Sequence, residues 1–134
     1  MATVRKEIAT KASPSAVWAA LRDVGALHTR LVPGFVTDTR LEPGARIVTF
    51  ADGRVVREPI VAIDDEFMRV VWSAESSLAT HFNGAAQVFA MSDGSAKIIW
   101  IADFLPHEIA PQIDAAMSAG AAAMNRALDR LAAP

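Results

Sequence analysis

The sequence predicts one soluble α+β domain, spanning residues 1–134, in which a curved antiparallel sheet of seven strands wraps around a long C-terminal helix. The chain length suits a single domain with one core. Short strand-like runs separated by turn residues fill its middle, and an apolar stripe at helical spacing fills its end. Because a strongly bent sheet cannot lie flush on a straight helix, we expect an apolar, ligand-sized cavity between them.

The N-terminal segment predicts a strand followed by two short helices. Residues 3–10 alternate crudely between polar and apolar side chains, which indicates a strand. Ser13 can cap a helix through its hydroxyl oxygen, and Pro14 suits the first helical position. A second helical turn over residues 26–31 ends at a Pro-Gly pair.

The middle of the chain predicts six further strands joined by tight turns. The pair Asp52-Gly53 is a typical hairpin signal, and other turn residues separate the remaining runs. Such spacing is typical of an antiparallel meander. The expected strands cover residues 35–41, 46–50, 54–63, 67–74, 80–91 and 96–104.

The last segment, residues 106–131, predicts the long helix. Its apolar stripe is lean, with small residues and methionines where leucines would form a dense core. Small residues would either let the helix approach the sheet closely or leave a void, and methionines suit a wall that adapts to varied ligands. The stripe comprises Ile109, Ile113, Met117, Gly120, Met124, Leu128 and Leu131.

Composition excludes several classes of function. The formal net charge is −2 and no basic run interleaves with aromatic residues, so we expect no nucleic-acid partner. The absence of cysteine excludes disulfides and thiolate chemistry. The widely spaced His28, His81 and His107 do not form a metal-ligand motif, and no phosphate-binding glycine loop occurs. We therefore expect neither a metal nor a cofactor.

The sequence also bears on location and assembly. No apolar signal-peptide core occurs near the N-terminus, and the longest later apolar stretch, residues 98–102, is too short to span a bilayer. These features favour a cytoplasmic protein without integral membrane association. The sequence leaves open whether the chain forms a homodimer.

Strand alternation identifies candidate walls of the cavity. If Lys97 and Arg69 face solvent, then Trp100, Phe104 and Trp72 point inward. An ordinary packed core would place large aromatic residues in the same way. The expected lining comprises Trp72, Val88, Trp100 and Phe104 from the sheet and Met117, Gly120 and Met124 from the helix.

The strand over residues 80–91 carries the first candidate for chemistry. Simple alternation places His81 and Asn83 on the solvent face. Gly84 sits in mid-strand, where glycine often marks a bulge, and a bulge would turn both side chains toward the cavity. In that register His81 could act as a general acid or base.

Further polar candidates lie in other elements. Glu58 would be a plausible acid or base if it points inward, because burial raises the pKa of a carboxyl. The alternative is a salt bridge from Glu58 to Arg46 or Arg69 on a neighbouring strand. His28 and Arg30, on the second short helix, would lie near a cavity mouth, either binding an anionic ligand group or simply solvated.

Beside the order of elements, several segments carry a family resemblance: residues 13–18, 32–36, 57–58 and 64–65, and Gly94 leading into residues 99–106. Together they resemble the START-like (SRPBCC) superfamily, most closely its polyketide cyclase/dehydrase and lipid-transport branch. The likeness covers the whole chain and implies the helix-grip fold. One departure is the lack of tyrosine, so a mechanism that needs a phenol cannot carry over.

Two hypotheses of function follow from the residues and the resemblance. The first is binding of a small hydrophobic or aromatic ligand, lipid- or polyketide-like, in the cavity. The second is a cyclase or dehydratase in which His81 works with Glu58 or Asn83. The sequence favours the first, because binding needs only the cavity, whereas catalysis also needs the bulge at Gly84.

Overall fold

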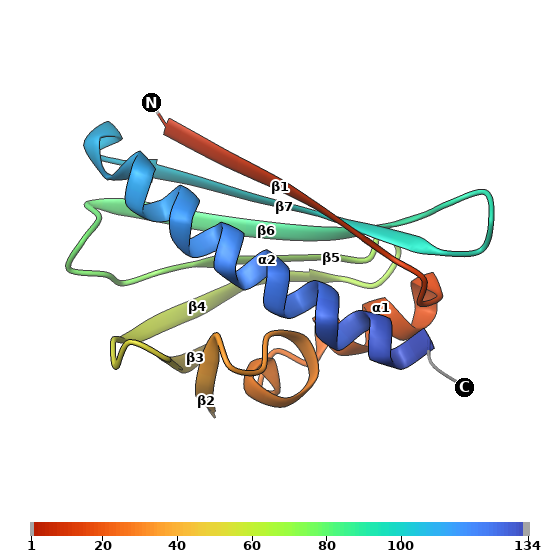
Figure 1. Cartoon of the computed structure of the whole chain (residues 1–134). Helices are drawn as coiled ribbons and strands as arrows, with labels where there is room; N and C mark the ends of the chain where they lie inside the picture. Colours follow the sequence, from red (N-terminus) through yellow and green to blue (C-terminus); the bar gives the residue numbers. More distant parts are fainter. Residues whose placement is uncertain (1, 133–134) are drawn as a thin grey trace.

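The computed structural model describes residues 2–132, which contain one seven-stranded antiparallel sheet and four helical segments. Figure 1 shows their arrangement. The strands lie in the order β1-β7-β6-β5-β4-β3-β2. The elements are β1 (Ala2–Thr10), α1 (Pro14–Arg22), the π-helix η1 (Leu27–Leu31), β2 (Val36–Glu42), β3 (Ala45–Phe50), β4 (Val55–Asp64), β5 (Arg69–Ser73), β6 (His81–Ala90), β7 (Ala96–Leu105), the 3-10 helix η2 (His107–Ile109) and α2 (Ala110–Ala132).

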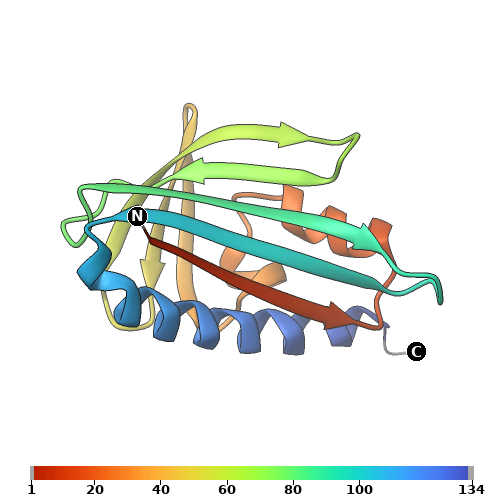
Figure 2. The ribbon, with the colours of Figure 1, turned by 90° about the horizontal axis from the view of Figure 1, so that it is seen from above.

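The long helix α2 crosses the concave face of the sheet, as both ribbon views show (Figures 1 and 2). It packs along β1 and against η1, while α1 contacts β5, β6 and β7. The strands on the far side of the sheet, β2 to β4, curl beneath the helix (Figure 1). The predicted fold class, a curved antiparallel sheet gripping a C-terminal helix, is confirmed.

Helix α1 begins where the sequence predicts. The hydroxyl of Ser13 accepts a hydrogen bond from the Ala16 amide at 3.2 Å, and Pro14 occupies the first turn. Asp65, in the turn after β4, accepts hydrogen bonds from Trp18 Nε1 at 3.0 Å and Arg22 Nε at 2.9 Å. The β4–β5 turn therefore fixes α1 against the sheet.

Two element boundaries differ from the sequence-based expectation for local reasons. Strand β5 begins at Arg69, two residues later than expected, because the turn after β4 is longer. There the Asp64 carboxylate accepts the Phe67 amide at 3.1 Å, and Met68 has a positive φ of 53°. At the C-terminus, the η2 turn precedes α2, which begins at Ala110.

Alternation along the strands determines which side chains reach the interior. On β7, Ile98, Ala102 and Phe104 are buried, whereas Asp103 between them is exposed. Buried apolar side chains form two clusters that share Trp100: a larger one around α1, η1 and the C-terminal half of α2, and a smaller one around Phe104 and the start of α2. Trp100 thus lies where the two clusters meet.

Candidate functional site: an apolar cavity with a buried ion pair

A cavity of about 130 Å³ lies between the concave face of the sheet and α2. Among its lining residues, only Arg46, Arg54, Glu58 and Ser76 carry charged or hydroxyl groups. The remaining lining residues are Leu21, Leu27, Leu31, Val32, Phe35, Val36, Val48, Phe50, Val56, Val70, Trp72, Ala74, Leu78, Ala79, Phe82, Ala86, Trp100, Ile113, Ala116, Met117 and Met124. Such a lining favours an apolar ligand with few polar groups.

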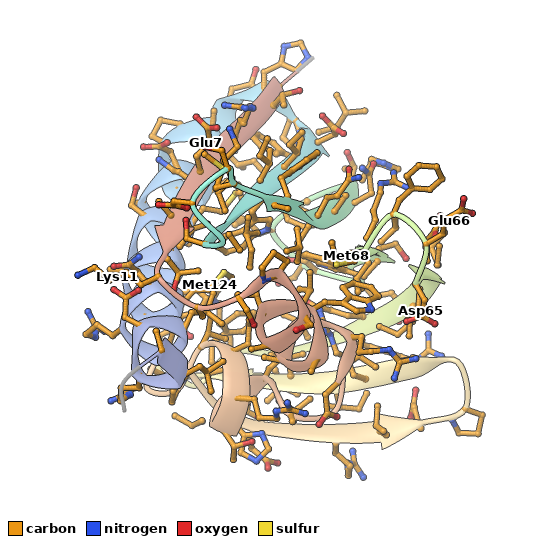
Figure 3. The ribbon with its side chains drawn as sticks, turned by 90° about the vertical axis from the view of Figure 1, so that its right-hand side faces the viewer. Glu7, Lys11, Asp65, Glu66, Met68 and Met124 are labelled. Carbon is orange, nitrogen blue, oxygen red and sulfur yellow. The ribbon has the colours of Figure 1, made fainter. Side chains whose placement is uncertain are left out.

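The helix side of the cavity is made by Ile113, Ala116, Met117 and Met124. In Figure 3, the labelled side chain of Met124 projects from α2 toward the interior. Gly120, which was expected in the lining, does not belong to it. A Cβ at this position would lie 2.9 Å from the Trp100 ring and 3.1 Å from Phe35. Gly120 therefore lets the Trp100 ring pack against the helix backbone. Of the two alternatives for the small residues of the stripe, close approach of helix and sheet holds at this position, and a void does not.

The sheet side is organised by the β3–β4 hairpin. In the observed register, Arg46 pairs with Glu58 and Val48 with Val56, and Phe50 forms a backbone hydrogen bond to the residue before β4, Arg54. All six side chains line the cavity. The hairpin thus places three pairs along the cavity wall. Arg46 and Glu58 lie at the deep end, Val48 and Val56 lie in the middle, and Phe50 and Arg54 lie at the outer end.

The deep ion pair joins Arg46 to Glu58. Arg46 Nε donates to Glu58 Oε1 at 2.8 Å, and the two side chains are only 4% and 9% exposed. The Arg46 guanidinium also lies 5.2 Å from the centre of the Trp72 ring and donates to the Val24 carbonyl at 3.4 Å. The structure thus confirms the salt-bridge alternative for Glu58, with Arg46 and not Arg69 as its partner.

The Glu58 carboxyl could nevertheless take part in acid–base chemistry. Burial raises the pKa of its carboxyl above the ordinary value of 4.5, and the neighbouring Arg46 offsets this only in part. No hydrogen bond from residues 2–132 reaches its second oxygen, Oε2. A carboxyl in this position could exchange a proton with a bound molecule.

The raised pKa of Glu58 predicts a specific pH dependence of stability. The folded protein binds this proton more tightly than the unfolded chain, so the contribution is fully present below about pH 4.5 and is lost as the pH rises through the folded pKa. We expect the free energy of unfolding of the wild type, relative to Glu58→Gln, to fall over that range. Urea titrations of both proteins between pH 4 and 8 measure it; a constant difference would contradict the assignment.

The outer end of the cavity is bounded by Phe50, Arg54 and the loop over residues 74–80. At the base of this loop, the Glu75 amide donates to the Arg57 carbonyl at 2.9 Å, and Arg57 Nη1 contacts Glu75 Oε1 at 2.8 Å. Arg54 is about half exposed, although it lines the cavity. These residues mark the mouth.

His81 and Asn83 lie on the opposite, outer face of the sheet. Strand β6 pairs with β5 and β7 without any register shift at Gly84, so the bulge hypothesis is wrong and simple alternation holds. His81 is exposed, and its Nε2 lies 2.7 Å from Asn83 Oδ1. Asn83 in turn donates to Asp103 at 3.2 Å. The chain of polar groups faces away from the cavity.

Gly84 is required for packing. It pairs with Trp72 on β5, and a Cβ at Gly84 would lie 2.5 Å from the Trp72 ring. The indole lies across the glycine and extends along the cavity wall. A glycine in mid-strand suggested a bulge in the sequence, but here it leaves room for an aromatic ring to pack against the strand backbone.

Of the other expected site residues, some line the cavity and some do not. Trp72 and Trp100 line the cavity, whereas the inward-facing Val88 and Phe104 do not, because they are buried in the clusters toward the two ends of the sheet. His28 and Arg30 on η1 are also absent from the lining. Arg30 is exposed and pairs with Asp23 at 2.9 Å, and His28 Nδ1 is buried without a hydrogen-bond partner in the described residues.

Sequence reasoning overlooked the mouth of the cavity. Arg54, Phe50 and Phe35 were not among the expected lining, and neither was the loop over residues 74–80. The period-two pattern contained part of the signal, because Arg46, Val48 and Phe50 share one face of β3. Two charges on inward positions of paired strands are typical of a buried ion pair beside a site.

The fold and its cavity define a helix-grip protein of the START-like class. The chain belongs to the family described as "Polyketide cyclase / dehydrase and lipid transport", whose model matches residues 1–134. A search of curated proteins gave no match. Among residues 2–132, no helix has the length and apolar character needed to cross a membrane.

Solved structures share the fold at low sequence identity. XoxI from Bacillus cereus is 19% identical with a TM-score of 0.86, and the alignment covers all of both chains. The di-domain ARO/CYC BexL from the BE-7585A biosynthetic pathway is 15% identical with a TM-score of 0.85, over all of this chain and 48% of that one. Norcoclaurine synthase from Thalictrum flavum, in complex with a transition-state analogue, is 20% identical with a TM-score of 0.73, over 98% and 93% of the two chains. The family description supports a ligand-binding or cyclase role, and these neighbours show the shared fold.

Proposed function

We propose that the protein binds a small, largely apolar ligand in the cavity between the sheet and α2. The observation that carries this proposal is the lining itself, which is apolar apart from the few polar groups on the hairpin and the adjoining loop. Two flexible methionines, Met117 and Met124, suit a wall that adapts to ligands of different shape. Lipid-like and polyketide-like molecules both fit this description.

Tryptophan fluorescence tests the proposal directly. Trp72 and Trp100 line the cavity, whereas Trp18 does not and is hydrogen bonded to Asp65. A bound aromatic or acyl ligand should therefore change the emission of the first two residues. The panel comprises fatty acids, flavonoids and aromatic polyketides, with Trp18→Phe to remove the background emission. If no member of the panel changes the emission, the proposal fails.

A variant that fills the cavity should abolish binding. Ala116 lines the cavity from α2, so Ala116→Phe would place a ring in the space that the ligand needs. We expect the affinity for a panel ligand to fall about tenfold or more, which corresponds to about 1.4 kcal/mol. Ala119→Phe is the matched control, because Ala119 is exposed on the same helix. Isothermal titration calorimetry compares the two; equal losses, or none, would contradict the location of the site.

Catalysis by a cyclase or dehydratase is the second candidate, favoured by the buried carboxyl of Glu58 with its raised pKa. In this version Glu58 is the acid or base, because His81 and Asn83 lie on the outer face. Turnover of a polyketide-like substrate should fall at least about 10²-fold in Glu58→Gln and stay unchanged in His81→Ala. Unchanged turnover in Glu58→Gln together with lost turnover in His81→Ala would assign the acid–base role to His81.

A further inference from the structure

One arginine at the cavity mouth has an unused binding face. Arg54 lines the cavity, yet its side chain is 47% exposed. Its guanidinium lies 4.9 Å from the centre of the Phe50 ring, and its Nε donates to Asp52 Oδ2 at 2.8 Å. The ring and the carboxylate thus hold the guanidinium in one orientation.

The two terminal nitrogens of Arg54 have no hydrogen-bond partner among residues 2–132. Because the guanidinium is planar, this end of the fork matches the two oxygens of a carboxylate. Asp52 cannot easily turn to occupy it, since its Oδ1 already accepts the Arg54 backbone amide at 3.0 Å. The free edge is therefore available to a bound molecule.

The charges of the lining favour an anion. Arg46, Arg54 and Glu58 are the charged side chains that line the cavity. Glu58 is engaged by Arg46 at 2.8 Å. Arg54 is therefore the lining cation that a ligand can reach without disrupting this pair, and Asp52, which lies outside the lining, contacts only the Nε of its guanidinium. An apolar ligand with one negative group would satisfy this charge at the mouth and would require none to be buried.

The spacing along β3 sets the length of the apolar body. Arg54 lies opposite Phe50, and Arg46 is four residues further along the strand. At about 3.3 Å per residue, the outer cation and the deep ion pair are about 13 Å apart along the strand. Val48 and Val56 form an apolar wall between them.

From this arrangement we infer that the ligand is a monocarboxylate with an apolar body, whose carboxylate is bound at the mouth by Arg54 and whose body reaches toward the Arg46–Glu58 pair. This inference rests on the proposed function and narrows it to an anionic class. The pair at the deep end would also bind a hydroxyl group of the ligand, because Glu58 Oε2 can accept a hydrogen bond and has no partner in the described residues.

Decanoate and decan-1-ol test the inference, since they share an apolar chain and differ in charge. Their affinities are measured at pH 8 by displacement of the neutral fluorophore N-phenyl-1-naphthylamine. We expect the wild type to prefer decanoate by about twofold to fivefold. Arg54→Gln should remove this preference by weakening decanoate alone. Arg69→Gln, an exposed arginine outside the cavity, is the matched control.

Asp52→Asn provides a change in the opposite direction. It removes a negative charge beside Arg54 and keeps the oxygen that accepts the backbone amide, so decanoate should bind more tightly and decan-1-ol as before. Equal affinities for the two probes in the wild type, or an unchanged preference in Arg54→Gln, would overturn the inference and leave the apolar site standing. If neither probe displaces the fluorophore, the inference fails, and the proposed function fails for ligands with a linear apolar chain.

Discussion

Glu58→Leu is expected to lower the free energy of unfolding by about 3–5 kcal/mol, because it leaves the Arg46 guanidinium buried without a counter-ion. Both side chains are almost fully enclosed, and the pair is joined at 2.8 Å. Arg46→Met should be similarly costly at pH 8. Its cost should become smaller as the pH is lowered, because burial raises the pKa of the Glu58 carboxyl and the protonated form carries no charge.

The double variant Arg46→Met/Glu58→Leu separates the cost of an unpaired charge from the worth of the pair. Apolar side chains of similar volume remove both charges, so we expect stability within about 1 kcal/mol of the wild type, or above it. Arg57→Met is the matched control, because Arg57 precedes Glu58 on β4 but pairs with Glu42 and Glu75 on the exposed side. Its cost should stay below about 1 kcal/mol.

Urea denaturation followed by circular dichroism measures this set of variants. Additive losses in the double variant would show that the two residues do not act as a pair. A cost for Arg57→Met as large as that for Glu58→Leu would show that burial does not decide the effect. Recovery in the double variant together with loss of ligand binding would show that the pair serves binding and not stability.

Gly84→Ala is expected to destabilise the fold by about 1–3 kcal/mol and to change tryptophan emission. The added methyl would lie 2.5 Å from Trp72 Cε2, 2.6 Å from Cζ2 and 2.8 Å from Nε1. The far end of a flexible side chain could swing away, but an indole ring bordered by Arg46 cannot do so freely. The ring would be displaced into the cavity, so ligand affinity should fall as well.

Two further variants test the cause of this effect. In Trp72→Phe/Gly84→Ala the smaller ring leaves room for the methyl, so part of the lost stability should return relative to the sum of the single variants. Ala85→Val changes the next residue, on the outer face of β6, and should cost little. Thermal denaturation and emission spectra measure all of them. Wild-type stability and emission in Gly84→Ala would refute the close packing of Trp72 on Gly84.

The local elements were predictable because their signals are short in range. Ser13 and Pro14 start α1 through groups within three residues of each other, and period-two patterning sorted β5 and β7 into inner and outer faces. Helix α2 was equally readable from its apolar stripe. Such patterns depend only on backbone periodicity and on which side of an element is apolar.

The site was less predictable because alternation tells which face a residue occupies but not how far along the sheet it lies. Val88 and Phe104 share the inner face with Trp72 and Trp100. They are covered by the packed clusters at the two ends, and the cavity opens between them. Where the helix and sheet separate depends on side chains from several elements at once.

The sequence by itself determined the antiparallel sheet, the long helix, the inner faces of β5 and β7 and the expectation of an enclosed apolar space, because these follow from periodicity, capping and turn chemistry. The tertiary structure alone decided the meaning of Gly84 and Gly120. Each glycine accommodates a tryptophan from a distant segment, Trp72 and Trp100 respectively. Contacts between such segments are set by how the sheet curves around α2, and no local pattern records them.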